Sequence, residues 1–140
     1  MVYLDTSVLV AGLTNELQTP RIQAWLAGQS ADSLAISDLV VTELSAALSI
    51  KLRTGQVTSD LRASALALFQ HLVAEALTVF AVEPRHFRAA ARLADQQELG
   101  LRAGDALHLA VVADHSLELC TLDRRLAQAG PTLGIRSRLV

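Results

Sequence analysis

The chain has 140 residues, which is enough for one domain with a substantial core. Hydrophobic residues make up 51% of it and charged residues 19%, which excludes an intrinsically disordered chain or a charged binding tail. The net charge is −2, so no overall basic character indicates nucleic-acid binding. Eleven of the twelve basic residues are arginine. Arginine suits contacts with phosphate or carboxylate, but the bias equally fits the composition of a GC-rich genome.

The compartment is indicated by the N-terminus and the cysteine content. The longest apolar run, residues 8–13, is too short to cross a membrane, so no membrane partner is expected. Asp5 interrupts the N-terminal apolar stretch and no basic leader precedes it, which argues against a secretory signal. Cys120 is the single cysteine, and its leucine neighbours predict a buried thiol in a reducing cytosol. We therefore expect a cytoplasmic protein.

Its high mean hydropathy of +0.36 predicts apolar surface covered by a partner.

Strands alternate with helices along the chain. Apolar runs rich in β-formers predict strands at 2–5, 34–36, 78–82 and 117–122. Capping hydroxyls, prolines at first helical positions and terminal glycines predict helices at 6–13, from 19, at 38–53, from 59, at 84–100, 102–115 and 123–129. No repeat or linker divides the chain, so one domain over residues 1–140 is expected. The alternation predicts an α/β sandwich with a mainly parallel sheet.

Four acidic residues at widely separated points stand in apolar surroundings: Asp5 in VYLDTSVLV, Glu43 in LVVTELSAAL, Asp105 in RAGDALHLA and Asp123 in LCTLDRRLA. A buried carboxylate costs several kcal/mol unless it is paired or metal-bound. Asp5 and Asp123 end predicted strands, where ligands of parallel sheets bind. Asp105 falls in the first turn of its helix, where the dipole favours a negative charge. Glu43 lies on an otherwise apolar helix face. An acid in that position is a poor core residue but a good metal ligand.

Each acid also has a local interpretation. Asp5 and Asp123 could cap the helices that follow them, and Asp105 could pair with Arg102 one turn back. Glu43 could extend its carboxylate to solvent. These interpretations are independent of one another, whereas one metal site explains all four acids together.

The donor set indicates a hard divalent cation. Oxygen ligands suit Mg²⁺, with Mn²⁺ as a substitute, and no Cys or His stands at the spacing of a zinc site. Thr6, Ser7 and Thr121 supply hydroxyls that could orient a ligand or a bound water, although helix capping is the simpler role for Thr6 and Ser7. His108 lies one turn after Asp105 and could hydrogen-bond it, with core or surface packing as the alternative. Such a site suits phosphodiester hydrolysis with one or two metal ions.

The segments LDTSVLV, RAGDALHLA and TLDRRL, with Glu43 isolated in a helix between them, resemble the PIN-domain ribonucleases. The resemblance spans the whole chain and extends to the VapC-type toxins of bacterial toxin–antitoxin pairs. It implies a three-layer α/β/α sandwich around a parallel sheet and a Mg²⁺- or Mn²⁺-dependent endoribonuclease. It places the family's acidic quartet at Asp5, Glu43, Asp105 and Asp123, and its hydroxyls at Thr121 and at Thr6 or Ser7. It further implies a homodimer and a cognate antitoxin that occludes the acidic site.

The hypothesis that follows gives Asp5, Asp105 and Asp123 to the metal, with Glu43 as a further ligand or as the group that positions the attacking water. Cleavage of RNA would then leave a 5′-phosphate and a 3′-hydroxyl. Lys51, Arg53 and Arg124 are candidates for phosphate contacts, with surface solvation as the alternative for each.

Three other functions compete with the ribonuclease. A metal-dependent phosphatase could use Asp5 as its nucleophile, but a second aspartate is expected two residues later, where this chain has Ser7. A DNA-processing nuclease on the same fold would need an additional DNA-binding element, for which 140 residues leave little room. A non-catalytic module that binds an antitoxin or RNA would have no need to keep all four acids.

Overall fold

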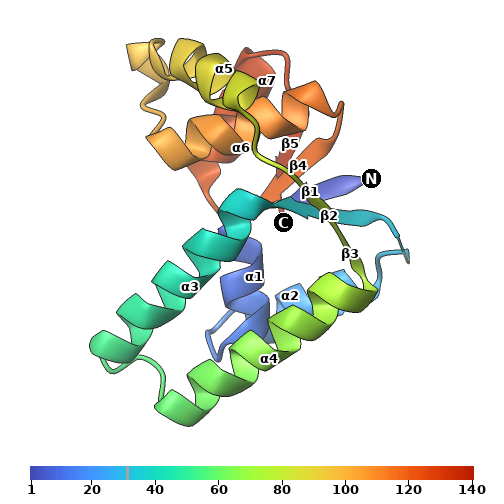
Figure 1. Ribbon diagram of the computed structural model, residues 1–140, viewed down its shortest axis with the longest axis vertical. Helices are drawn as coiled ribbons and strands as arrows, with labels where there is room; N and C mark the ends of the chain where they lie inside the picture. The colour runs from blue at the N-terminus through green and yellow to red at the C-terminus, as the bar shows by residue number, and fades with distance from the viewer. Residues whose placement is uncertain (31) are drawn as a thin grey trace.

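Strands and helices alternate along the chain, as the sequence predicts, in a computed structural model that describes residues 1–30 and 32–140 (Figure 1). The strands of its single described sheet are β1 (Val2–Leu4), β2 (Leu34–Ser37), β3 (Leu77–Phe80), β4 (Glu118–Thr121) and β5 (Ser137–Leu139). The α-helices of the described residues are α1 (Thr6–Leu13), α2 (Thr19–Ala27), α3 (Asp38–Arg53), α4 (Ser59–Glu75), α5 (Pro84–Ala94), α6 (Ala103–Asp114) and α7 (Arg124–Thr132).

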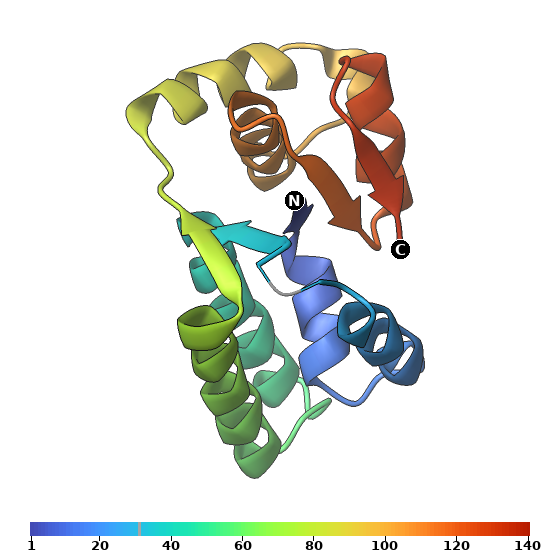
Figure 2. The same cartoon turned by 90° about the vertical axis from the view of Figure 1, so that its right-hand side faces the viewer.

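The five strands are all parallel and lie in the order β3-β2-β1-β4-β5. The chain moves from β1 through β2 to the edge strand β3, then crosses back to β4 and β5. Because parallel crossovers are right-handed, this reversal places the two sets of helices on opposite faces. Figures 1 and 2 show α1 to α4 on one side of the sheet and α5 to α7 on the other. The predicted α/β/α sandwich is confirmed, and the boundary between β1 and β4 is its topological switch point.

The central strands are buried on both faces. Tyr3 and Leu4 of β1 and Leu119 and Cys120 of β4 are fully buried, which explains why these strands are apolar runs with no polar alternation. The core continues into α1 and α3, and Leu44 and Leu48 of α3 are fully buried within it. This packing fixes where β1 and β4 end, and therefore where the residues that follow them lie.

The C-terminal segment departs from the prediction. The sequence predicts a last helix that ends at residue 129 and no strand after it, whereas α7 extends to Thr132 with Pro131 inside it. Pro131 has no N–H for the carbonyl of Ala127, and the Ser137 hydroxyl donates to that carbonyl at 2.8 Å instead. A Cβ on Gly130 would lie 2.1 Å from Ser137 Oγ, so glycine allows β5 to approach the helix this closely.

Two other predictions concern α5 and Cys120. Helix α5 ends at Ala94 and does not reach Gly100, because a 3₁₀ turn (Gln97–Leu99) separates it from α6. Cys120 is free and buried, as predicted, and burial raises the pKa of its thiol to about 11. No helix within the described residues is long and apolar enough to cross a membrane.

Candidate functional site

A cavity of about 480 Å³ opens where β1 and β4 end. Eleven residues line it: Asp5, Thr6, Ser7, Glu43, Ala46, Ala47, Ile50, Arg102, Asp105, His108 and Asp123. We call it the acidic cavity, because all four acids singled out in the sequence line it and Arg102 is the one basic side chain among the lining residues other than His108. Its position at the switch point is where open parallel sheets bind ligands.

Asp5 forms the floor of the acidic cavity and is only 4% exposed. It ends β1 and is the N-cap of α1, accepting a hydrogen bond from Val8 N. Its Oδ1 also accepts from Ser7 Oγ at 2.5 Å, and its Oδ2 accepts from Thr121 Oγ1 at 2.5 Å. Burial raises the pKa of Asp5 above its ordinary value, and the two hydroxyls oppose that rise. A buried carboxylate held by hydroxyls favours neutralisation by a proton or a cation.

Thr121 joins the ends of the two central strands. It is fully buried at the end of β4, donates to Asp5, and accepts a hydrogen bond from Asp123 N at 2.9 Å. Ser7 makes a second link, because its Oγ accepts from Leu122 N at 2.9 Å. These hydroxyls therefore fix the position of Asp5 relative to the backbone that precedes Asp123. Thr121 thus does more than pack within its strand.

Glu43 reaches the acidic cavity from α3 and meets the N-terminus of α6. Its Oε2 accepts hydrogen bonds from Thr6 Oγ1 and from His108 Nε2, the latter at 2.9 Å. Its Oε1 would lie 2.6 Å from a Cβ built on Gly104, so any side chain there would displace this carboxylate. Burial alone would raise the pKa of Glu43, but the hydrogen bond and charge of His108, with Thr6 and Arg102, lower it overall. Glu43 is therefore a carboxylate at neutral pH.

Asp105 and Asp123 form the rim, bridged by Arg102. Asp105 Oδ2 accepts from Arg102 N at 3.0 Å and from Arg102 Nε at 3.2 Å. Arg102 Nη2 lies 3.5 Å from Asp123 Oδ2, and its side chain is 70% exposed. Asp123 also caps α7 by accepting from Arg125 N and Leu126 N. An exposed guanidinium between two carboxylates is a cation that a divalent ion could displace.

The local interpretations of Asp5, Asp105 and Asp123 are all present, since two of them cap helices and one pairs with Arg102. The capping role considered for Thr6 and Ser7 is absent: Asp5 caps α1, and their hydroxyls bond carboxylates instead. Nevertheless all four acids line one cavity. Their donor set consists of carboxylate and hydroxyl oxygens, which fits Mg²⁺ or Mn²⁺. Glu43 Oε1 occupies the place that a Cβ on residue 104 would take, and glycine at this position allows it.

Of the other predicted residues, His108 lines the acidic cavity, whereas the basic candidates for phosphate contacts do not. His108 contacts Glu43 and not Asp105, because it projects from α6 toward α3. Lys51 pairs with Glu16 at 2.6 Å, and none of Lys51, Arg53 and Arg124 lines the acidic cavity. The sequence predicts Arg102 only as a partner of Asp105. Its position three residues before Asp105, at a helix start, also indicates that it faces the same cavity.

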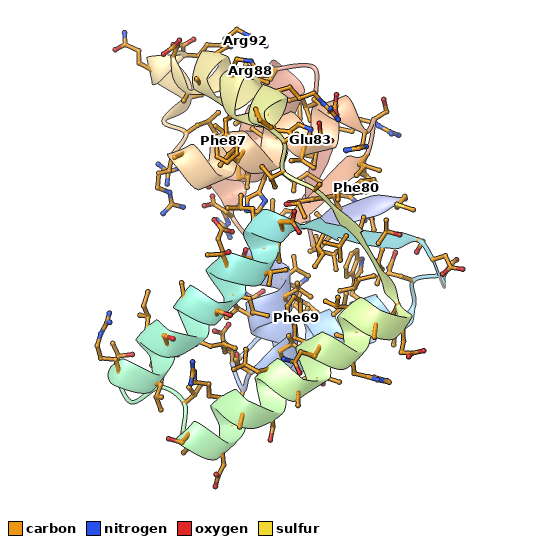
Figure 3. All side chains as sticks on the ribbon, in the orientation of Figure 1. Phe69, Phe80, Glu83, Phe87, Arg88 and Arg92 are labelled. Atoms are coloured by element: carbon orange, nitrogen blue, oxygen red, sulfur yellow. The ribbon has the colours of Figure 1, made fainter. Side chains whose placement is uncertain are left out.

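A second cluster brings His86, Asp114 and His115 together. Within residues 1–30 and 32–140, it is the only set of three His, Cys, Asp or Glu side chains whose ligand atoms lie within 4.8 Å of one another. His86 Nδ1 accepts from Glu83 N at 2.9 Å, so its Nε2 carries the proton and donates to Asp114 at 3.0 Å. Glu83 lies on the segment between β3 and α5 (Figure 3). The Nδ1 lone pair of His86 is therefore used in the cap of α5, which makes His86 a poor metal ligand.

The chain belongs to the PIN-domain family, whose family model matches residues 2–130. PIN domains typically bind divalent metal ions. No curated protein matches the sequence.

Solved structures share the fold over nearly the whole chain. VapC20 of Mycobacterium tuberculosis, a toxin that cleaves the sarcin-ricin loop, is 18% identical with a TM-score of 0.73, covering 93% of this chain and 95% of its own. PAE2754 of Pyrobaculum aerophilum is 28% identical with a TM-score of 0.68, covering 98% and 83%. VapBC2 of Rickettsia felis, bound to a DNA fragment from its promoter, is 18% identical with a TM-score of 0.67, covering 99% and 98%. The structural neighbours are thus VapC toxins of toxin–antitoxin systems.

Proposed function

We propose that this protein is a Mg²⁺- or Mn²⁺-dependent endoribonuclease that acts as the toxin of a type II toxin–antitoxin pair. One observation carries the proposal: four carboxylates from separate parts of a PIN domain line one cavity at the switch point of the sheet. The similarity to VapC20, which cleaves a ribosomal RNA loop, supports RNA as the substrate.

The metal would be held by Asp5, Asp105 and Asp123, with Glu43 as a further ligand or as the acceptor that positions water. When bound, it would supply a nucleophilic water and neutralise charge on the scissile phosphate. Ser7 and Thr121 hold both oxygens of Asp5 in place, so this carboxylate needs little reorganisation. Attack by water on phosphorus, with the 3′-oxygen leaving as a hydroxyl, gives a 5′-phosphate and a 3′-hydroxyl.

Arg102 would contact the RNA phosphate. Its guanidinium is exposed at the rim of the acidic cavity, and a cation taking Asp105 and Asp123 would release it. Arginine then offers a fork of donors that matches phosphate oxygens. Arg102 replaces Lys51, Arg53 and Arg124 as the best-placed candidate for this contact.

A cognate antitoxin would occlude the acidic cavity, and the toxin would form a homodimer in the cytoplasm as a single domain. The net negative lining favours a basic side chain from the partner. Apolar side chains stand exposed on the helices nearby, with Val41 and Ile50 on α3 and Leu68 on α4. Covering them would account for the high mean hydropathy. A protein partner that blocks RNA cleavage when bound, and light scattering at twice the chain mass, would support these assignments.

The geometry disfavours the phosphatase alternative. Both oxygens of Asp5 accept hydrogen bonds from hydroxyls, and the side chain is almost fully buried. A covalent nucleophile must be reached by the phosphorus atom of the substrate, which the burial of Asp5 hinders, whereas a small cation needs only one remaining oxygen lone pair.

The test is cleavage of total RNA by the purified protein in Mg²⁺, Mn²⁺ and EDTA. We expect discrete metal-dependent cuts with 5′-phosphate ends and a loss of more than about 100-fold in Asp105→Asn, since even groups outside the ligand shell are worth 10–100-fold. Asp60→Asn makes the same chemical change on the exposed face of α4 and should cleave normally. Ends bearing a 2′,3′-cyclic phosphate, or full activity in Asp105→Asn, would contradict the proposal. A folded protein that binds metal and cuts no RNA would favour the non-catalytic module.

A further inference from the structure

A buried chain of hydrogen-bonded side chains leads from the core to Glu43. The hydroxyls of Ser37 and Tyr3 are 2.7 Å apart, and Tyr3 Oη lies 2.8 Å from His108 Nδ1. His108 Nε2 lies 2.9 Å from Glu43 Oε2. Ser37 and Tyr3 are fully buried and His108 is 4% exposed. The chain therefore reaches the surface mainly through the half-buried carboxylate of Glu43.

The four residues come from elements on both faces of the sheet. Tyr3 lies in β1, and Ser37 ends β2 as the N-cap of α3. Glu43 lies on α3 at one face, while His108 lies on α6 at the other. The hydrogen bonds thus link α3 to α6 across the carboxyl edge of the sheet, next to the switch point.

The hydrogen-bond network determines where the protons lie. A carboxylate only accepts, so in the hydrogen bond between His108 and Glu43 the hydrogen is on His108 Nε2. In the neutral ring His108 Nδ1 then accepts from the Tyr3 hydroxyl, which in turn accepts from Ser37. All donors then point the same way, toward Glu43, in a low-dielectric interior that strengthens each bond.

A packing role does not require this chain. Burying two hydroxyls and an imidazole costs free energy unless every polar group is satisfied, and apolar side chains would fill the same volume without that cost. The chain ends on a single oxygen, Glu43 Oε2, which also accepts from Thr6. Both of the Glu43 hydrogen bonds found within the described residues are therefore to Oε2, while Oε1 faces Gly104. Two donors therefore hold Oε2, whereas no donor within the described residues bonds Oε1.

We propose that His108, held by Tyr3 and Ser37, is a positioning residue that orients Glu43 in the acidic cavity so that Oε1 is presented to the cation or its water. The inference rests on the proposed function, since it assigns Glu43 to the metal-dependent chemistry. His108 itself touches neither metal nor RNA and acts only through Glu43.

The test compares His108→Leu, His108→Gln and Tyr3→Phe in two assays: Mn²⁺ affinity by isothermal titration calorimetry, and kcat and KM for RNA cleavage. Gln places a donor near the position of His108 Nε2, whereas Leu fills similar space without one. We expect His108→Leu to weaken Mn²⁺ binding and lower kcat by about 10–100-fold with KM for RNA unchanged. His108→Gln should recover most of both losses, and Tyr3→Phe should lose less than His108→Leu. His71→Leu on the exposed face of α4 is the matched control.

A role in packing alone predicts a different pattern, because Gln would be no better than Leu and both would lower the free energy of unfolding without a selective change in kcat. That pattern, or wild-type Mn²⁺ affinity and cleavage in His108→Leu, would overturn the proposal. If His108→Leu does not fold, Tyr3→Phe decides by the same two assays, since it removes one oxygen and keeps the ring. If the wild type cuts no RNA but Mn²⁺ affinity follows the expected order, the positioning role holds and the nuclease function fails.

Discussion

The acidic cavity and the His86–Asp114–His115 cluster both gather ionisable side chains, but their charges are compensated differently. In the cluster, Asp114 Oδ2 accepts from Arg85 Nη2 and His86 Nε2, both at 3.0 Å, so its charge is satisfied within the protein. In the acidic cavity four acids face one exposed arginine and one histidine. The cluster has the closer ligand atoms, yet the cavity has the uncompensated charge. We therefore prefer the acidic cavity to the cluster as the proposed cation site, because its carboxylate charge is in surplus.

Among residues that hydrogen-bond the acids, we expect Thr121→Val to lower RNA cleavage the most. This change keeps the shape of the side chain and removes its hydroxyl. Asp5 loses a donor and Asp123 N loses its acceptor, so we expect RNA cleavage to fall by about 10–100-fold. The free energy of unfolding should fall by about 1–3 kcal/mol, because two polar groups lose their partner. Parallel cleavage assays and urea titrations measure the two losses. Unchanged cleavage would show that Asp5 does not depend on this hydroxyl.

A smaller effect is expected from Gly104→Ala. The new Cβ would lie 2.6 Å from Glu43 Oε1 and would displace that carboxylate, which should lower cleavage about tenfold. Alanine also favours the helix by about 0.5–1 kcal/mol, so stability should stay the same or rise. When both are measured on one preparation, RNA cleavage should therefore fall while thermal stability stays the same or rises. A variant that loses both would mean that α6 itself is disturbed.

The smallest effect is expected at the cluster, in Asp114→Asn. The His86 hydrogen bond and Arg85 lower the pKa of Asp114, so the folded state holds the charged form more strongly than the unfolded state does. The resulting stability is present above the ordinary carboxyl pKa of 3.8 and is lost as pH falls through the lowered value. Because the group is exposed, the wild type should exceed the variant by less than about 1 kcal/mol near neutral pH.

Urea unfolding of both proteins between about pH 6 and pH 3 checks this, with the difference expected to shrink toward acid. RNA cleavage should be unchanged in Asp114→Asn. A loss of metal-dependent cleavage in Asp114→Asn would mean that the cluster also takes part in the metal-dependent reaction, which would contradict the comparison of the two regions.

The sequence predicts the central strands and the acids well for a physical reason. Strands buried on both faces, such as β1 and β4, are short apolar runs, and an acid directly after such a run marks the edge where ligands bind. Strand β5 has no such signal, because its three residues include the exposed Leu139 and the charged Arg138.

Contacts between elements are harder to predict. His108 is three residues from Asp105 but hydrogen-bonds Glu43, which is 65 residues away, because the way α3 and α6 face each other is set by packing across the sheet edge. The same holds for the link between Thr121 and Asp5, 116 residues apart. The sequence therefore yields the acids of the cavity but not the network that orients them.

We propose that the cation binds in the acidic cavity. Calorimetric titration with Mn²⁺ of the wild type, Asp5→Asn and Asp114→Asn tests this placement. We predict that binding is lost in Asp5→Asn and unchanged in Asp114→Asn. Binding that survives in Asp5→Asn and disappears in Asp114→Asn would place the metal at the histidine cluster and contradict the account.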